Sequence, residues 1–333
     1  MWKRNGAGVV IFCYICQKKI NIMKKAILAT IVGLSVIACP ILYFLVGPEL
    51  DPAQLQVLRT LVIIAGCSAL FCFTVGEITG NNSQMDKLWS LLPEIYVWII
   101  AIEGGMKPRL VVMAVLATLW GVRLTFNFAR KGAYRLKFWE GNEDYRWPIL
   151  RARKEFQPHW KWVIFNFLFI SIYQNALILM TTFPALVSMN SSVPFGWLDA
   201  VAAVLMLGFV IYEFVADEQQ WKFQTRKWEL IGSGKKLEEL PAPYNLGFNT
   251  SGLWNRSRHP NYFAEQGTWI SLYIFSVAAG TGIFNWSIIG ALLLVVLFQG
   301  SSSLGEEISG EKYPEYRNYC SKVLKFFPFK KYK

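Results

Sequence analysis

Long apolar runs alternate along this chain with short segments that are rich in charged residues. Most runs approach or exceed the ~20 residues that a helix needs to cross a bilayer. We identify eight candidate spans, at residues 26–46, 57–79, 88–102, 110–128, 162–189, 197–216, 267–280 and 283–299. The third and the seventh are short, so seven spans remain an alternative. Because lipid offers no hydrogen-bond partners to an open backbone, the pattern predicts an all-α fold, a polytopic transmembrane bundle of seven or eight spans.

Basic residues are concentrated in four segments outside the apolar runs. Of the 34 Lys and Arg residues, 29 lie in residues 1–25, 129–161, 217–261 and 301–333. The loops at 47–56, 181–196 and 280–285 hold none. Cytoplasmic loops carry an excess of Lys and Arg, so we expect the basic segments and both termini on the cytoplasmic side. The loop at 103–109 is an exception, because it contains Lys107 and Arg109 and should lie outside.

Composition supports a membrane protein and argues against other classes. The chain is 54% hydrophobic and 17% charged, whereas soluble domains carry roughly 25% charged residues. The net charge of +12 follows from the basic loops and their contact with anionic lipid. Aromatic residues lie in the spans and not in a basic groove, so we expect no nucleic acid as a partner. Cys13 and Cys16 form a C-x-x-C without a second pair or a nearby His, so we expect no metal site.

The segment 252–265 carries the sharpest chemical signal. Pro260 is suited to the first position of a helix. Arg256, Arg258 and His259 then lie at a helix N-terminus, where free N–H groups and the positive end of the dipole favour an anionic phosphate. A solvated basic loop is the alternative, and it would explain the arginines.

The residues that follow do not fit that alternative. Asn261 and Glu265 are four apart and share a helix face, while His259, Tyr262 and Glu265 follow a three-residue step along an adjacent face. Ionisable groups just inside a membrane helix are functional by default. We therefore expect this segment to form a binding site.

Three further polar clusters flank the spans. Glu213, Asp217 and Gln220 are spaced i, i+4, i+7 on one helical face, with Arg226 beyond them. We expect a polar wall that faces the 252–265 segment, although an ordinary interfacial helix end is the alternative. The loop Glu143–Arg146 and the tail residues Glu306, Glu307, Tyr313, Tyr316, Arg317 and Tyr319 are weaker signals, because solvated segments often look the same.

These motifs together resemble the steroid 5-alpha-reductase-like family of integral membrane proteins. The matching residues are Gly252-Leu253-Trp254, Ser257 to Phe263 with Glu265, Glu143 to Arg146, Glu213 with Asp217 and Gln219, Trp120-Gly121-x-Arg123-Leu124, and Tyr313-x-x-Tyr316 ending at Phe327-Pro328. The chain is closest to a branch distinct from the steroid enzymes. The resemblance divides it into a basic extension at 1–25, N-terminal membrane helices at 26–84 and a catalytic membrane domain at 85–330.

The resemblance implies an NADPH-dependent reductase of an activated C=C bond in a lipid or steroid-like substrate. The cofactor-binding residues would be Asp217, Gln220, Arg226, Asn255, Arg258, His259, Asn261, Tyr262, Glu265 and Tyr316. NADPH carries a 2′-phosphate that Arg usually binds, and Arg226, Lys235, Lys236 and the 130–135 stretch supply positive charge for it. The membrane would be a bacterial inner membrane or the endoplasmic reticulum.

The acid of the reaction is less well defined. Steroid reductases pair a glutamate on an early span with a tyrosine on a later one. Asp86 is the nearest candidate for the carboxylate and thus for the catalytic residue. Trp120 falls where the tyrosine would lie, and an indole cannot transfer a proton.

Two alternatives remain open at the level of sequence. Isoprenylcysteine carboxyl methyltransferases share an Arg-His-Pro-x-Tyr segment with a downstream glutamate, where it holds S-adenosylmethionine. The second alternative is a non-catalytic protein that binds lipid. The sequence does not predict the oligomeric state.

Overall fold

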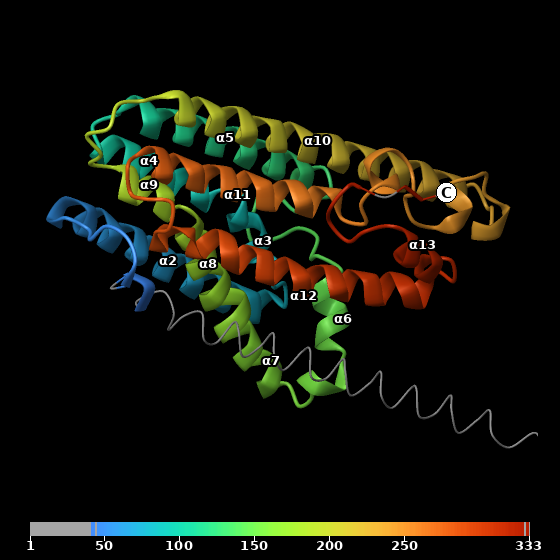
Figure 1. The fold of residues 1–333 in the computed structure, drawn as a ribbon. Helices are drawn as coiled ribbons and strands as arrows, with labels where there is room; N and C mark the ends of the chain where they lie inside the picture. The colour runs from blue at the N-terminus through green and yellow to red at the C-terminus, as the bar shows by residue number, and fades with distance from the viewer. Residues whose placement is uncertain (1–40, 44, 330, 333) are drawn as a thin grey trace, which may run out of the picture.

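The computed structural model describes residues 41–43, 45–329 and 331–332, and every regular element among them is helical (Figure 1). The longer helices are α2 (Pro52–Thr79), α4 (Leu92–Glu103), α5 (Pro108–Ala129), α10 (Trp197–Gly232), α11 (Pro260–Ala278) and α12 (Ile289–Lys312). The shorter ones are α3 (Gln84–Trp89), α6 (Arg146–Arg151), α7 (Trp160–Phe165), α8 (Gln174–Thr181), α9 (Phe183–Ser188) and α13 (Tyr316–Lys322). A π-helical segment (Asn166–Tyr173) joins α7 to α8, and short 3₁₀ turns lie at Lys154–Phe156, Leu237–Glu239, Tyr244–Leu246, Gly252–Asn255 and Trp286–Ile288.

Five helical runs in the described part of the chain are long and apolar enough to cross a membrane. They are Pro52–Thr79, Pro108–Ala129, Trp160–Ser188, Trp197–Gly232 and Trp286–Lys312. The predicted all-α fold of membrane type is therefore confirmed. The two short predicted spans correspond to α4 and α11, which are not among the five, so a total of seven or eight stays a prediction. The basic extension 1–25 and nearly all of the first predicted span lie outside the described residues.

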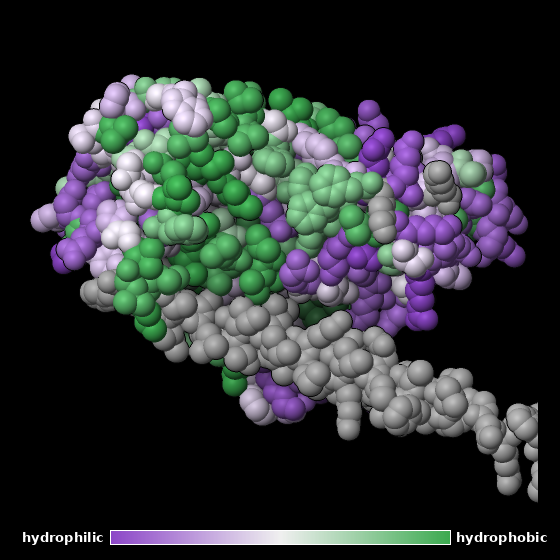
Figure 2. Space-filling view, in the orientation of Figure 1, coloured by the Kyte–Doolittle hydropathy of each residue, from purple (hydrophilic) through white to green (hydrophobic). Residues whose placement is uncertain are grey.

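The surface shows where the membrane would lie. Figure 2 shows hydrophobic residues gathered over the middle of the bundle, with polar residues toward both ends and most of them at the end that holds the C-terminus. The 36 residues of α10 give a length of about 54 Å at 1.5 Å per residue. That exceeds the ~30 Å hydrocarbon core, so α10 continues well into the polar region.

The loops fall at two ends of the bundle, as the charge pattern predicts. At the end with few basic residues, Asn190 donates to Asp51 over 2.6 Å and Trp286 donates to the Pro48 carbonyl over 2.9 Å. At the other end, which we call the basic end, the segments 129–161 and 217–261 meet the C-terminal tail. Arg153 lies 3.4 Å from Glu307 there, and the backbone N–H of Arg258 donates to the Leu324 carbonyl. The assignment of this end to the cytoplasm stays a prediction.

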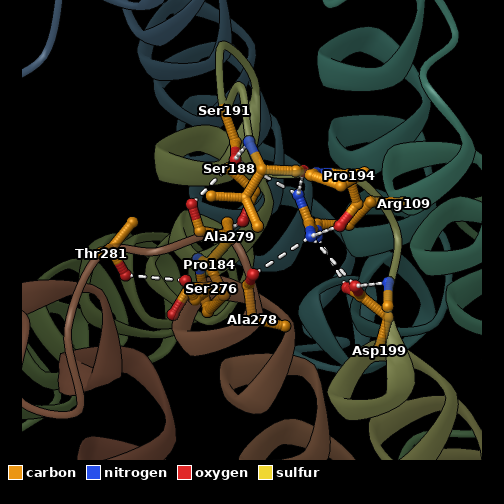
Figure 3. Close-up of polar contacts among 12 residues, drawn as sticks. Arg109, Pro184, Ser188, Ser191, Pro194, Asp199, Ser276, Ala278, Ala279 and Thr281 are labelled. Atoms are coloured by element: carbon orange, nitrogen blue, oxygen red, sulfur yellow. Dashed lines mark hydrogen bonds and ion pairs between the residues drawn. The ribbon is translucent and has the colours of Figure 1, made fainter.

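The two basic residues that break the charge pattern are structural. Arg109 is buried, and its Nε lies 2.6 Å from the Asp199 carboxylate. The same guanidinium donates to the carbonyls of Val193, Pro194 and Ala278, so it joins the starts of α5 and α10 to the end of α11 (Figure 3). Lys107 donates to the Met189 carbonyl. The charge of Arg109 is thus neutralised inside the protein, whereas Lys107 is exposed and contacts carbonyl groups alone.

Helices α5, α10 and α11 run side by side and carry the candidate site (Figure 1). The packing of α10 along α11 is the most extensive between any two described helices. Gly267 makes this close approach possible, because a Cβ atom there would lie 2.5–2.6 Å from the ring of Phe209.

Candidate functional site

A buried cluster of four charged side chains joins α5, α10 and α11. Arg123 on α5 is at the centre, and its Nη1 lies 2.7 Å from Asp217 Oδ2. Its Nη2 lies 3.0 Å from Glu213 Oε1 and 3.6 Å from Glu265 Oε2. All four side chains are buried. We call Arg123, Glu213, Asp217 and Glu265 the ion cluster.

Two tryptophans orient one member of this cluster. The indole Nε1 of Trp120 donates to Glu265 Oε2 over 2.6 Å, and Trp269 Nε1 donates to Glu265 Oε1 over 3.0 Å. The two rings meet edge to face with centroids 4.9 Å apart. Trp269 follows Glu265 by one helical turn, so its contact comes from the helix itself. Trp120 occupies the position expected for a tyrosine and fixes a carboxylate there.

The two polar faces predicted from the sequence do meet. Asn261 on α11 donates to Asp217 Oδ1 on α10 over 3.4 Å, and Glu265 lies one turn further along the same helix face. Pro260 begins α11, as predicted. The structure therefore brings together Asp217, Asn261 and Glu265 from the predicted site residues.

A group of polar side chains lies beside the ion cluster at the basic end. Lys131 is exposed, yet desolvation by the surrounding protein lowers its pKa, against the opposing effect of Asp217 and Asp144. Tyr145 is 58% exposed, and burial nevertheless raises its pKa. Tyr262 lies within electrostatic range of this region.

The residues of this polar group come from four elements. It comprises Asp86 of α3, Lys131, Asp144 and Tyr145 of the loop after α5, Arg146 at the start of α6, and Tyr262 of α11. We call this set the polar recess.

Hydrogen bonds to the region of α3 hold the loop that forms one wall of the recess. Lys87 is buried and donates to the carbonyls of Phe138 and Glu140 over 2.7 and 2.8 Å. The backbone N–H of Asp144 donates to Ser83 Oγ over 2.8 Å. These contacts place a loop that carries several charges against the short helix α3.

The two carboxyl groups of the recess differ in their surroundings. Burial raises the pKa of Asp86, and the nearby Asp144 adds to that effect, while Trp147 donates to Asp86 Oδ2 over 2.8 Å. Burial also acts on Asp144, but Arg146 lies 2.7 Å away and holds the pKa of Asp144 below its usual value. Asp86 thus takes up a proton more readily than Asp144.

Arg258 and His259 are engaged within the protein. Glu306 on α12 lies 2.9 Å from His259 Nε2 and 3.2 Å from Arg258 Nε. The imidazole stacks on the ring of Tyr262 with centroids 5.4 Å apart, and Tyr262 stacks on Phe298. Burial lowers the pKa of His259, although Glu306 opposes the shift. These residues form the partition between the recess and the tail.

The remaining predicted residues have no contact with the ion cluster among the hydrogen bonds and ion pairs of the described residues. Arg226 is exposed and pairs with Glu229 on the same helix. Asn255 donates to the Tyr332 carbonyl and so ties down the tail. Tyr316 is buried and lines a separate cavity of about 330 Å³ near Cys320. Gln220 has a buried Oε1 without a hydrogen-bond partner. Their roles in cofactor binding stay predictions.

Sequence reasoning gave Arg123 and Lys131 no individual role. Arg123 is the one basic residue in the predicted span 110–128. An arginine inside a membrane span needs a carboxylate partner, and that rule points to the acidic residues of α10 and α11. No comparable signal marks Lys131, because it is one of nine basic residues in the segment 129–161.

Comparison with known proteins identifies the family of this chain. A family model described as a protein of unknown function (DUF1295) matches residues 72–323, which include the ion cluster and the polar recess. That family lies within the steroid 5-alpha-reductase-like superfamily. An uncharacterized protein of fission yeast, C594.04c of Schizosaccharomyces pombe, is 36% identical over 280 residues, or 78% of each chain. No solved structure matches. This chain therefore belongs to the DUF1295 family of membrane-type helical proteins.

Proposed function

We propose that this protein is a membrane reductase that uses NADPH to reduce an activated C=C bond in a hydrophobic lipid or steroid-like molecule. The observation that carries the proposal is the polar recess, which contains cationic side chains and adjoins the ion cluster. A dinucleotide needs positive charge for its phosphates and neutral polar partners for its ribose and amide groups. The recess and the cluster offer both within a membrane protein, next to apolar helices that suit a lipid.

The side chains fit such a cofactor. Lys131 and Arg146 would bind the phosphates, since both lie in the recess and Lys131 is exposed. Gln220 Oε1 is a buried acceptor without a hydrogen-bond partner, and an amide or hydroxyl donor would satisfy it. When bound, NADPH supplies the hydride.

The cavity beside Tyr316 is a poorer place for phosphate. Three glutamates line it, namely Glu306, Glu307 and Glu311. Their negative charge opposes a phosphate group. We therefore assign the phosphates to the recess, and assign Tyr316 at most to an uncharged part of the cofactor.

Asp86 would act on the substrate. Its raised pKa allows the carboxyl group to keep a proton in the recess. A neutral carboxyl can donate a hydrogen bond to a conjugated carbonyl and stabilise the negative charge that develops on the oxygen as hydride arrives.

One observation favours a second function. The ion cluster has three carboxylates for one guanidinium, and surplus negative charge suits a cationic ligand such as the sulfonium of S-adenosylmethionine. A lipid methyltransferase is therefore the competing proposal. A protein that only binds lipid would have affinity for neither nucleotide cofactor.

Cofactor titrations test the proposal. Purified protein in detergent should bind NADPH in preference to NADH and to S-adenosylmethionine. Lys131→Ala should weaken NADPH binding by about ten- to a hundredfold, since a charge-assisted contact contributes ~1.5–3 kcal/mol. Lys137→Ala is the matched control, because this lysine belongs to the same loop but is largely exposed and pairs with Glu140. Binding of S-adenosylmethionine without NADPH would support the methyltransferase instead.

A further inference from the structure

The ion cluster holds more negative charge than Arg123 can balance. Three carboxylates lie within 2.7–3.6 Å of its guanidinium nitrogens, so the fully ionised cluster would carry two surplus negative charges. Arg130 and Lys131 face Asp217 from the end of α5 and compensate that carboxylate. No comparable second cation faces Glu213 and Glu265 among the described residues. A buried charge without compensation is costly, and such a group binds a proton instead.

The contacts of the two glutamates show which of them keeps the proton. Glu265 accepts hydrogen bonds from Trp120 and Trp269 on its two oxygens, and N–H donors of this kind stabilise the ionised form. Glu213 is 5% exposed, and its Oε2 has no donor. The carboxyl groups of Glu213 and Glu265 both lie against Arg123 Nη2, at 3.0 and 3.6 Å, so they are neighbours on one guanidinium nitrogen that a hydrogen bond through a shared proton would join. Two carboxyl groups can share such a bond only if one of them is protonated.

We propose that Glu213 and Glu265 share one proton, with Glu213 as the acid, and that this pair is a proton-binding site inside the membrane domain. Arg123 and the two indoles hold the negative charge of the pair. The adjoining recess gives water a route from the basic end. This assignment rests on the contacts of α5, α10 and α11 and holds whichever cofactor the protein uses.

The use of the proton rests on the proposed function. Saturation of a C=C bond needs one hydride and one proton. The hydride adds to one carbon, the O–H bond of Glu213 breaks, and its proton forms the C–H bond on the neighbouring carbon. The carboxylate left on Glu213 regains a proton from water in the recess. Asp86 keeps its own proton in the hydrogen bond to the carbonyl, so the two acids have separate tasks.

Infrared spectroscopy of the full chain without any cofactor tests the proton-binding site. At neutral pH the wild type should show the carbonyl-stretching band of a protonated carboxyl group, with a shift in D₂O. Glu213→Gln should remove the Glu213 component of that band and leave the component of Asp86, because it replaces a neutral acid with a neutral amide of the same shape. Glu94→Gln is the matched control: Glu94 Oε2 is also buried without a partner, but the residue lies outside the ion cluster, so the Glu213 component should persist.

A second variant keeps the test decisive if Glu213→Gln does not fold. Glu265→Gln removes the acceptor of the shared proton, and the Glu213 band should then change frequency without disappearing. A protonated-carboxyl band that both variants leave unchanged would overturn the proposal. Because the measurement uses no nucleotide, its outcome is separate from that of the NADPH titration, and the donor role fails alone if Glu213→Gln reduces lipid at the wild-type rate.

Discussion

The interpretation of Trp120 depends on its hydrogen-bond partner. As a replacement for a tyrosine it removes a proton donor from the expected position. In the structure its N–H group holds Glu265 in place at 2.6 Å. An indole donates a hydrogen bond without exchanging a proton, so it can fix a carboxylate beside Arg123 while the acid chemistry is carried by other residues.

The titration of His259 leads to a prediction about the stability of the protein at acid pH. Burial lowers its pKa in the folded protein, so protonation favours the unfolded state. Its contribution to stability is fully present above the unfolded pKa of ~6.5 and is lost as the pH falls toward the folded value, by at most ~1.4 kcal/mol per pH unit.

Thermal unfolding of detergent-purified protein between pH 7 and pH 5 measures this effect. His259→Gln should remove part of the acid sensitivity. His159→Gln should not, because that side chain is 72% exposed. Equal acid sensitivity in the wild type and in His259→Gln would show that this histidine is not the group responsible.

At the scale of the helices, the sequence predicts where apolar character ends and not where a helix ends. The run 197–216 corresponds to α10, which continues to Gly232. Likewise the run 283–299 corresponds to α12, which continues to Lys312. The residues added to α10 are rich in Glu, Lys, Gln and Arg, which are good helix formers, whereas those added to α12 include three Glu and one Lys but also four Ser and three Gly. Hydropathy registers the edge of the bilayer, while the hydrogen-bonded backbone continues past it.

The residues of the candidate site also differ in how far the sequence predicts them. Facing positions on α10 and α11 could be predicted, because Asp217, Asn261 and Glu265 follow helical spacing within their own segments. The convergence on Arg123 could not, since it depends on how three helices pack. The polar recess could not be predicted either. It depends on the irregular loop after α5, which hydrogen bonds from Lys87 hold against α3.

The ion pair between Arg109 and Asp199 leads to a prediction about the stability of the contact between α5 and α10. It joins the starts of α5 and α10 in a buried setting. Arg109→Ala would leave Asp199 without its cation, and the free energy of unfolding should fall by ~3–5 kcal/mol.

Chemical denaturation in detergent measures the loss. Lys107→Ala is the control, because its one strong contact is to a partly exposed carbonyl at Met189, and it should change stability much less. The double variant Arg109→Met with Asp199→Leu should recover much of the stability, because it removes both buried charges. A loss in Arg109→Ala no larger than that in Lys107→Ala would contradict this account.

At the scale of the whole molecule, the two ends of the bundle differ in charge and in contacts. The basic end carries the polar recess, the partition at His259 and the tail. At the opposite end the Arg109 contacts shown in Figure 3 join the loop before α10 to the start of α5. A cofactor from solution would therefore enter from the basic end, while a lipid would approach from the apolar flank visible in Figure 2.

Reporter fusions test this polarity. Fusions after residues 140, 235 and 325 should all report the cytoplasm, because they fall in basic segments at one end. A fusion at residue 190 should report the other side. The shared recess fails as a model if the sites at 140 and 235 are found on opposite sides of the membrane.

In the reaction that we propose, this membrane protein transfers hydride from NADPH to a lipid. The most direct measurement incubates the purified protein, in vesicles made from a lipid extract of its source, with NADPH that carries deuterium at the transferable position. A parallel incubation receives S-adenosylmethionine with a deuterated methyl group. Mass spectrometry of the lipids should show one deuterium in a lipid saturated at a C=C bond, only in the first incubation, with the label reduced in Lys131→Ala. Label from the methyl donor alone, or from neither, would contradict the account.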